Sequence, residues 1–381
     1  MTRVVVVGAG IVGAACAFYG ARAGLEVTVL ERGAVAAGTT GAGEGNLLLS
    51  DKQAGPELDL ALRSSTLWDE LGAELGEEAF ELERKGGVVV AASAEGLASL
   101  RAFAAVQRDL GVASEPLDQA QLHEAEPHLS PALAGGAFYP GDMQVQPALA
   151  AASLLAAARG HGAVLRTGVE VIGGVLADGR LSGVRTSAGV TPADFVVNAS
   201  GTWGGQVSAR LGAAVPILPR RGFILVTEPL PRVVRHKVYS ADYVANVASD
   251  NPGLEMSPVI EGTRSGPVLI GASRERVGFD KRISLPVVRQ LAALAITLFP
   301  VLADVQLLRV YAGLRPYCPD HLPVIGADPR VPGLLHACGH EGAGIGLAPA
   351  TGELITDLIT GRATRVDPRP FGPERLIGQL A

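Results

Sequence analysis

Three glycines near the amino terminus have the spacing of a nucleotide-binding turn. Gly8, Gly10 and Gly13 form a Gly-x-Gly-x-x-Gly pattern directly after the apolar run at residues 4–7. In such a pattern the first glycine permits a tight turn, the second lets the backbone approach a pyrophosphate, and the third lets a helix pack against the strand. The helix that follows would direct unpaired N–H groups and its positive dipole end at the phosphates.

An acidic residue stands where such a site binds a ribose. Glu31 ends the second apolar run, "LEVTVL", and lies 18 residues after Gly13. A carboxylate at this place accepts hydrogen bonds from a ribose and repels a 2'-phosphate, which disfavours NADP. The alternative is a buried, glycine-rich helix that binds nothing. Because strand, helix, second strand and acid occur in register, we predict a dinucleotide site.

Three further segments favour FAD over NAD. Residues 33–48, "GAVAAGTTGAGEGNLL", form a small-residue loop in which Thr39 and Thr40 supply hydroxyl groups. Small residues also end the strand that leads into "NASG" at 198–201, and residues 334–359 predict a strand, a glycine loop and a helix. That helix would offer its amino terminus to the anionic pyrimidine ring of a reduced flavin. Taken singly, these segments could be a surface loop and a packing helix. One extended ligand that contacts all of them is more economically FAD.

Taken together, the motifs resemble those of the D-amino-acid-oxidase-like flavoprotein superfamily. Its members include glycine oxidase, sarcosine oxidases and the flavin subunits of D-hydroxyproline dehydrogenase and hydrogen cyanide synthase. The resemblance covers essentially the whole chain and rests on "VVVVGAGIVGAACA" with "VLER", on "NASGTWGG", on "GLRPYCPDHLPVIG" and on "ACGHEGAGIGLAPATG". The last motif looks closest to the hydroxyproline-dehydrogenase and cyanide-synthase type. Where the family usually has Ser-x-x-Asn-Ala-Gly beside the flavin, this chain has "GAGEGN".

The resemblance implies a noncovalent FAD. Cys318 invites comparison with the flavin-linking cysteine of monomeric sarcosine oxidases, but aligning the Pro-Asp pair places that cysteine near Gly313. The expected cofactor contacts are Gly8, Gly10, Ile11, Val12, Gly13, Glu31, Arg32, Thr39, Thr40, Gly43, Glu44, Gly45, Asn46, Val171, Ala199, Ser200, Gly201, Trp203, Gly313, Arg315, His340, Glu341, Gly342, Ala343, Gly344, Ile345 and Gly346.

The expected fold is α/β, a Rossmann-like FAD-binding domain of the glutathione-reductase type with an inserted α+β substrate domain built on an antiparallel sheet. The runs "GGVVVAAS", "RRGFILVTEP", "SPVIEG" and "GPVLIGAS" predict its strands, and helices at about 95–110 and 286–299 would cover it. The cofactor domain is expected from residues 1–84, 144–219 and 311–381, and the substrate domain from residues 85–143 and 220–310.

Arg315 is the expected substrate ligand. Flavin oxidation of an amine needs a C–H bond aimed at the flavin, so the protein mainly orients the substrate, and a guanidinium can hold a carboxylate through two bonds. In members such as glycine oxidase the arginine of a "GLRP" segment binds the substrate carboxylate; an ion-paired arginine between domains is the alternative. We expect His340 to tune the protonation of the amine, and Tyr239 and Tyr243 to cap the substrate pocket. A hydrogen bond in a turn and packing in the sheet are the respective alternatives.

Bulk properties exclude several other classes of function. The net charge is −6, and the arginines are scattered, which argues against a nucleic-acid partner. The apolar run at residues 4–21 could be taken for a membrane span or a signal peptide, but its glycine pattern favours strand, turn and helix. Cys16, Cys318 and Cys338 contain no Cys-x-x-Cys pair, as expected of reduced thiols in a cytoplasmic protein without a metal site.

The favoured function is FAD-dependent oxidation of a small amino or imino acid to an imine, by hydride transfer to flavin N5, followed by hydrolysis. Oxygen or an electron-accepting partner subunit would reoxidise the flavin, so a hetero-oligomer is an open alternative. Oxidation of a hydroxy acid or a polyol phosphate is a second hypothesis, for which "RRGF" and "VVRHK" are the candidate basic segments. A non-catalytic FAD-bound scaffold is the third.

Overall fold

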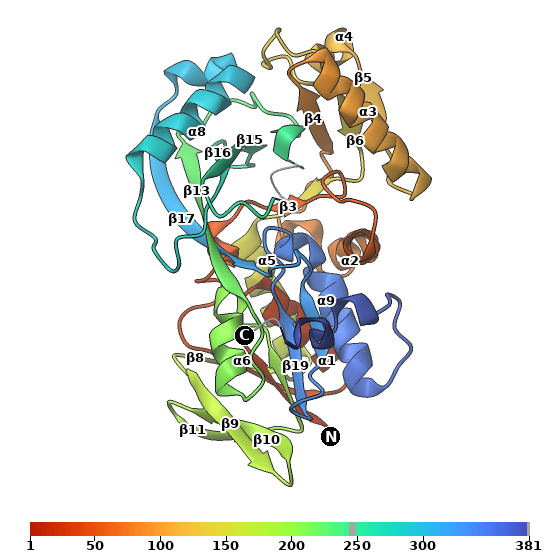
Figure 1. Cartoon of the computed structure of the whole chain (residues 1–381), viewed down its shortest axis with the longest axis vertical. Helices are drawn as coiled ribbons and strands as arrows, with labels where there is room; N and C mark the ends of the chain where they lie inside the picture. The colour runs from red at the N-terminus through yellow and green to blue at the C-terminus, as the bar shows by residue number, and fades with distance from the viewer. Residues whose placement is uncertain (244–248, 379–381) are drawn as a thin grey trace.

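The computed structural model describes residues 1–243 and 249–378. A six-stranded sheet lies in the lower half of the molecule in Figure 1 and an eight-stranded sheet in the upper half. The long strands β13 (Leu218–Thr227) and β17 (Leu307–Tyr317) run from the upper sheet toward the lower one, so they connect the two halves.

The six-stranded sheet has the order β18-β19-β12-β1-β2-β8, and its neighbours are parallel except β18 and β19. Its strands are β1 (Arg3–Val7), β2 (Glu26–Glu31), β8 (Val164–Thr167), β12 (Phe195–Asn198), β18 (Val324–Ala327) and β19 (Leu334–Cys338). The longer helices of this half are α1 (Ile11–Arg22), α2 (Pro56–Leu75), α5 (Pro147–Gly160) and α9 (Gly344–Thr360). The run at residues 4–21 is therefore a strand, a turn and a helix.

Both faces of this sheet are covered by other elements, which is why residues 4–7 of β1 are all apolar. Val4 and Val6 pack into the core beneath α1, whereas Val5 and Val7 face the opposite side. That side is covered by an antiparallel sheet and a short helix, namely β9 (Val171–Ala177), β10 (Arg180–Thr186), β11 (Gly189–Pro192) and α6 (Gly204–Arg210).

The eight-stranded sheet has the order β17-β13-β16-β15-β14-β4-β6-β5. Besides β13 and β17 its strands are β4 (Gly87–Ala91), β5 (Glu115–Leu117), β6 (Gly135–Tyr139), β14 (Lys237–Ser240), β15 (Glu255–Gly262) and β16 (Val268–Arg274). This half includes the helices α3 (Ala94–Asp109), α4 (Gln119–Ala125) and α8 (Leu285–Leu298). A small ladder joins β3 (Asn46–Leu47) to β7 (Met143–Gln144). The 3-10 helices are η1 (Thr40–Ala42), η2 (Glu77–Ala79), η3 (Gly201–Trp203), η4 (Pro300–Asp304), η5 (Arg369–Phe371) and η6 (Pro373–Leu376).

The expected α/β fold is confirmed, with one correction to the second sheet. β4 pairs in parallel with β14, so the sheet is mixed rather than antiparallel. The two strands are far apart in the chain, and no hairpin turn forces them to run in opposite directions. The domain division stays a prediction; the expected boundary at residue 311 falls inside β17, which continues to pair with β13 as far as Tyr317.

Candidate cofactor and active site

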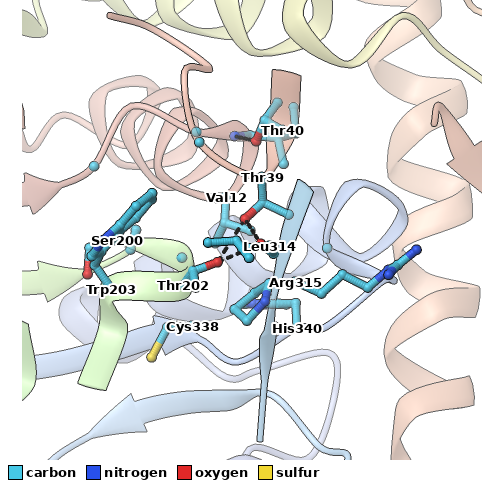
Figure 2. A pocket seen from close by; sticks show the side chains of 18 of the residues that line it. Val12, Thr39, Thr40, Ser200, Thr202, Trp203, Leu314, Arg315, Cys338 and His340 are labelled. Carbon is cyan, nitrogen blue, oxygen red and sulfur yellow. Dashed lines mark hydrogen bonds between the residues drawn. The ribbon is translucent and has the colours of Figure 1, made fainter. Parts of the chain in front are cut away.

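One cavity joins the segments that the sequence predicts to meet at a cofactor, and Figure 2 draws a part of its wall. Its lining comes from the turn after β1, the end of β2, the loop at 33–46, the turn after β12, strands β13 and β17, and the loop before α9. The carboxyl ends of β1, β2 and β12 thus open into the same space, as expected where an open parallel sheet binds a ligand.

The glycine turn leaves no room for side chains. Gly8 has φ +110°, and a Cβ there would lie 2.6 Å from the carbonyl oxygen of Ala199. A Cβ at Gly13 would lie 2.0 Å from the carbonyl oxygen of Gly8. Gly13 does not itself line the cavity, so its contribution is close packing of α1 on β1, as its place in the pattern predicts. Gly10 precedes α1 and lines the cavity.

Glu31 is held in place by the backbone around the turn. Its carboxylate accepts hydrogen bonds from the N–H of Ala9 at 2.9 Å and of Gly33 at 2.7 Å. Each carboxylate oxygen has a second lone pair, so Glu31 retains acceptors for ribose hydroxyls. Thr40 Oγ1 accepts a hydrogen bond from the N–H of Ile11 at 3.0 Å, which fixes the loop over the start of α1.

Two threonine hydroxyls fasten the loop at 33–46 and the turn after β12 to β17. Thr39 Oγ1 and Thr202 Oγ1 both donate to the carbonyl oxygen of Leu314 at 2.6 Å, as Figure 2 shows. The residue that follows Leu314 is Arg315. The sequence indicated Thr39 but not Thr202, which the motif "NASGTWGG" contains but gives no reason to single out.

Most of the predicted cofactor contacts line this cavity. They are Gly8, Gly10, Ile11, Val12, Glu31, Arg32, Thr39, Thr40, Gly43, Glu44, Asn46, Val171, Ala199, Ser200, Gly201, Trp203, Gly313, Arg315, His340, Glu341, Gly342, Gly344 and Ile345. Their assignment as FAD ligands stays a prediction, because lining a cavity is a matter of position alone.

Three further predicted contacts lie outside the cavity lining and are corrected here. Gly45 faces Val145, whose carbonyl oxygen lies 1.7 Å from the place of a Cβ. The carbonyl oxygen of Gly346 accepts hydrogen bonds from Ser64 and Trp68 of α2, so it serves helix packing. Ala343 caps α9 and lines a neighbouring chamber instead.

Several lining residues escaped sequence analysis because they come from the second sheet. Gly222 and Ile224 lie on β13, and neither belongs to a nucleotide-binding motif. Pro147, at the start of α5, also lines the cavity. Only the pairing of β13 with β17 brings Gly222 opposite Gly313.

Arg315 crosses the neighbouring strand to reach the next one. Its Nη1 donates to the carbonyl oxygen of Ser273 on β16 at 2.8 Å, and β13 lies between β17 and β16. A Cβ at Gly222 on β13 would lie 2.2 Å from that Nη1, so the crossing depends on this glycine. The rest of the guanidinium makes no hydrogen bond to the described residues and lines the cavity. Burial, with the nearby charge of Arg274, lowers the pKa of Arg315.

His340 is a neutral part of the cavity wall. Thr351 Oγ1 donates to the carbonyl oxygen of Leu347, so its contact of 3.0 Å with His340 Nε2 requires the imidazole to be the donor. Burial lowers the pKa of His340 to about 3. A histidine that stays neutral at ordinary pH does not tune the protonation of an amine by its own titration, so we correct that expectation and keep only its position beside the cavity.

The buried His340 predicts a loss of stability in mild acid. Between its usual pKa of 6.5 and its folded value of about 3, the unfolded chain binds more protons than the folded chain. The free energy of unfolding should therefore fall as the pH is lowered through this window, by up to about 1.4 kcal/mol per pH unit. His340→Asn should flatten this slope in urea unfolding at pH 5, 6 and 7, whereas His123→Asn, at an exposed position, should not. Equal slopes for the wild type and His340→Asn would contradict this.

The two tyrosines have different places. Tyr239 is fully buried, and its hydroxyl donates to Ser50 Oγ at 2.6 Å. It does not line the cavity, so its prediction as a substrate contact is corrected: a tyrosine on this sheet packs into the core. Tyr243 lies edge-on to Tyr239 and does line the cavity. Tyr243 is kept as a candidate substrate contact.

A buried group of charges reaches the cavity at Glu44. Lys237 Nζ lies 2.8 Å from Glu261 Oε2 and 3.6 Å from Glu44 Oε1, and all three side chains are at most 5% exposed. Burial raises the pKa of Glu44, although the charge of Lys237 opposes the shift. Glu44 Oε1 and Asn46 Oδ1 have no hydrogen-bond partner within the part of the chain that the structure describes.

These features fit FAD. The turn at Gly8 admits a pyrophosphate, the start of α1 offers N–H groups, and Glu31 is placed for a ribose. At the other end of the lining, the unpartnered acceptors of Glu44 and Asn46 are suited to donors of a bound ring, because buried polar atoms without partners are rare.

Buried thiols predict that the FAD is noncovalent. Cys338 lines the cavity, and burial raises its pKa to about 12, which keeps it a weakly nucleophilic thiol. Cys318 is fully buried outside the lining. Acid precipitation should therefore release the whole flavin content into the supernatant, measured by absorbance. Flavin fluorescence that stays with the denatured chain on a gel would contradict this.

Comparison with known proteins agrees with this geometry. The model of a family described as FAD dependent oxidoreductase (DAO) matches residues 3–358. Hydrogen cyanide synthase subunit HcnC of Pseudomonas aeruginosa is 35% identical over 82% of this chain and 73% of its own length, and glycine oxidase of Geobacillus kaustophilus is 32% identical over 99% and 98%.

Solved structures agree along the whole chain. The crystal structure of glycine oxidase from Geobacillus kaustophilus superimposes with a TM-score of 0.88 at 31% identity, covering 99% of this chain and 100% of that one. L-proline dehydrogenase from P. horikoshii gives a TM-score of 0.89 at 25% identity, covering 98% and 97%. Across residues 1–243 and 249–378, no helix is both long and apolar enough to cross a bilayer, and no cluster of His, Cys, Asp or Glu is suited to a metal ion.

Proposed function

Because this chain belongs to the family of FAD-dependent oxidoreductases, we propose that it oxidises the C–N bond of a small amino or imino acid to an imine, which water then hydrolyses. The relatives support a substrate of this kind, since one is named as a glycine oxidase. The substrate itself is part of the proposal.

The observation that carries the proposal is the guanidinium of Arg315 in the cavity wall. One of its nitrogens is held by the carbonyl oxygen of Ser273, which orients the group. Its remaining N–H groups have no partner among the described residues, and a carboxylate is the anion that fits them in a planar, two-bond arrangement. A half-buried cation without an anion is unfavourable, so a carboxylate-bearing substrate would relieve that cost on binding.

The chemistry needs little more from the protein than orientation. FAD, when bound, accepts the hydride that leaves the carbon beside the amine nitrogen. Arg315 holds the substrate carboxylate and so fixes the position of that carbon. The nitrogen loses a proton as the C=N bond forms, and water then adds to the imine to give an oxo acid and the free amine or ammonia. Tyr243 walls the same space and excludes water from one side.

A phosphate-bearing substrate gains no support from the two basic segments that the sequence offers for it, "RRGF" and "VVRHK". Arg220 is paired with Glu341 and Glu255, Arg221 with Glu275 and Asp280, and Lys237 with Glu261. Arg235, the remaining arginine of these two segments, donates to the carbonyl oxygen of Glu124 at 3.3 Å, and none of the four residues lines the cavity.

The electron acceptor separates two forms of the proposal. One relative is named as a subunit and another as an oxidase, so both a partner subunit and oxygen are represented among similar proteins. Peroxide production by the purified chain would identify oxygen as the acceptor. Turnover with an artificial dye but not with oxygen would exclude oxygen as the acceptor and favour a partner subunit, which copurification would then test. We also propose a cytoplasmic location, which three buried and unpaired cysteines support.

The experiment that tests the proposal is anaerobic reduction of the purified holoenzyme. Glycine, sarcosine, D-amino acids, D-proline derivatives and their dicarboxylic counterparts are mixed with it, and bleaching of the flavin absorbance is followed. Bleaching by at least one amine, with an oxo acid as the product, is expected. A protein that is yellow but unreactive toward the whole panel, and toward hydroxy acids, would be a scaffold instead.

A further inference from the structure

A second chamber adjoins the cofactor cavity on the substrate side of Arg315. The two spaces share Tyr243, Arg315, His340, Glu341 and Gly342 in their walls. The wall of this outer chamber, as we call it, is completed by the segment at 51–57, by Arg274, and by residues 320–322 and Ala343. A substrate bound to Arg315 would therefore extend into the outer chamber.

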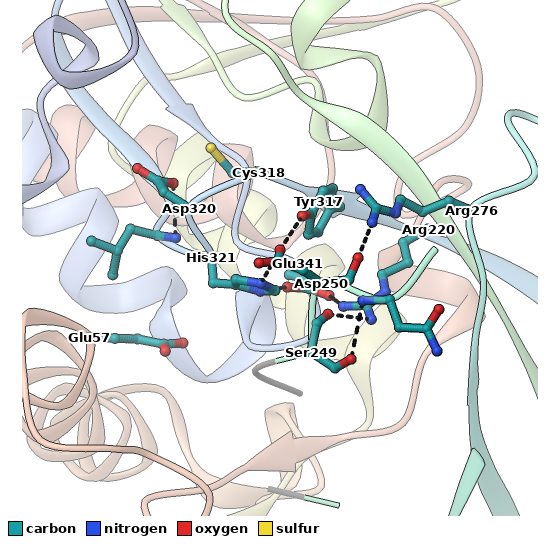
Figure 3. A network of polar contacts seen from close by, with 12 residues as sticks. Glu57, Arg220, Ser249, Asp250, Arg276, Tyr317, Cys318, Asp320, His321 and Glu341 are labelled. Atoms are coloured by element: carbon teal, nitrogen blue, oxygen red, sulfur yellow. Dashed lines mark hydrogen bonds and ion pairs between the residues drawn. The ribbon is translucent and has the colours of Figure 1, made fainter. Parts of the chain in front are cut away.

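The acidic side chains of the outer chamber are already paired. Figure 3 shows Glu341 between Arg220, at 2.6 Å, and His321, at 3.2 Å. These contacts hold the pKa of Glu341 below its usual value although burial would raise it. The other pairs are Asp51 with Lys52 at 2.7 Å, Glu57 with Lys52 at 3.7 Å, and Asp320 with Arg375 at 2.6 Å.

Two cations of this wall have no acidic partner among the described residues: Arg315, which is bound to the carbonyl oxygen of Ser273, and Arg274. Arg274 is 4% exposed, and its guanidinium lies 5.0 Å from the ring centroid of Tyr243. Its guanidinium makes no hydrogen bond or ion pair with any residue in the ranges 1–243 and 249–378, and its charge acts on Glu341 only at longer range. Removing a guanidinium from water without a partner is unfavourable, so an anion in the chamber would stabilise it.

The sheet places Arg274 beside Arg315. Arg274 ends β16, and the residue before it, Ser273, is the one whose carbonyl oxygen binds Arg315 Nη1. Because Gly222 of β13 has no side chain, the Arg315 side chain can cross β13 and reach that carbonyl oxygen. The two cations repel, since Arg274 contributes to the lowered pKa of Arg315. One carboxylate would leave this pair with a net positive charge, whereas two would neutralise it.

We propose that the substrate is a dicarboxylic amine, an amino or imino acid whose second carboxylate binds Arg274 while the first binds Arg315. This inference rests on the proposed function and adds the class of substrate to it. The aromatic ring of Tyr243, in contact with Arg274 and in the wall of both spaces, lies beside the chain that joins the two carboxylates.

Binding of unreactive acids tests the inference without turnover. Acetate, malonate, succinate and glutarate are titrated into the holoenzyme, and the shift of the flavin absorbance is measured. At least one diacid should bind about 10- to 100-fold more tightly than acetate, the gain expected from one charge-assisted hydrogen-bonded pair. Arg274→Met should reduce that gain to less than about threefold. Diacids that bind no better than acetate to the wild type would overturn the inference, with no variant needed.

Steady-state kinetics give the second readout. Sarcosine is compared with N-(carboxymethyl)glycine, and D-alanine with D-aspartate and D-glutamate. Arg274→Met should raise KM for the dicarboxylic member of a pair and leave the monocarboxylic member nearly unchanged. Arg276→Met is the matched control, because Arg276 lies two residues beyond the end of β16 and outside both cavities. An equal loss for both members would show that Arg274 and Arg315 share one carboxylate, which contradicts the inference.

If no amine reduces the flavin, the proposed function fails, while the diacid titration still decides the role of Arg274.

Discussion

Replacing Arg315 with Leu is expected to raise the Michaelis constant for a carboxylate-bearing amine by about 100-fold, equivalent to about 2.7 kcal/mol. The variant loses both hydrogen bonds to the carboxylate and leaves the anion in a cavity with less positive charge. Leu is similar in length to the apolar stem of arginine, and Leu314 and Pro316 on either side are buried, so β17 should keep its place. Initial rates of flavin reduction over a range of substrate concentrations would measure the change.

Two variants separate binding from other effects at this position. Arg315→Lys keeps a positive charge but not the planar fork, so its Michaelis constant should fall between those of the wild type and the Leu variant. Arg309→Leu makes the same change at an exposed position of the same strand and should leave the constant unchanged. A rise of less than tenfold in Arg315→Leu, with full FAD content, would refute the role of Arg315.

The second large effect concerns stability rather than turnover. Lys237→Met should lower the free energy of unfolding by about 3–5 kcal/mol, because it leaves two buried carboxylates without their cation. Lys237 is 1% exposed, and Glu261 and Glu44 raise its pKa against the effect of burial. Urea unfolding at a fixed FAD concentration would measure the loss, once the FAD dissociation constant of each protein is used to subtract the stabilisation that bound cofactor adds.

The pH dependence of this loss has a definite sign. Glu44 is a buried acid whose folded pKa already lies above its usual value, and without Lys237 the charge that opposes this shift is lost. Such an acid releases a proton on unfolding, so the variant should lose further stability as the pH rises from 5 to 8. Lys237→Met with Glu261→Gln should recover part of the loss. A loss below about 1 kcal/mol in the single variant would argue that the cluster is already open to water.

The sequence determined the cofactor half of the fold because its signals are local. A turn requires Gly8, and a helix contact requires Gly13, which lies within six residues of it. Glu31 completes the same strand, helix and strand unit. The helices expected at about 95–110 and 286–299 form at Ala94–Asp109 and Leu285–Leu298, since their apolar period lies within the segments themselves. The resemblance added Arg315 through one short motif.

Only the tertiary structure decided the substrate side. Arg274 belongs to no sequence motif. It lies close to Arg315 because the Arg315 side chain crosses β13, the strand between β17 and β16, at a position where β13 has a glycine. His340 could be titratable or neutral until its burial was known, and Tyr239 and Tyr243 look alike until one is placed in the core and the other in the cavity wall. Local sequence fixes turns and periods, whereas charge pairing and desolvation depend on residues that strand pairing brings together from distant parts of the chain.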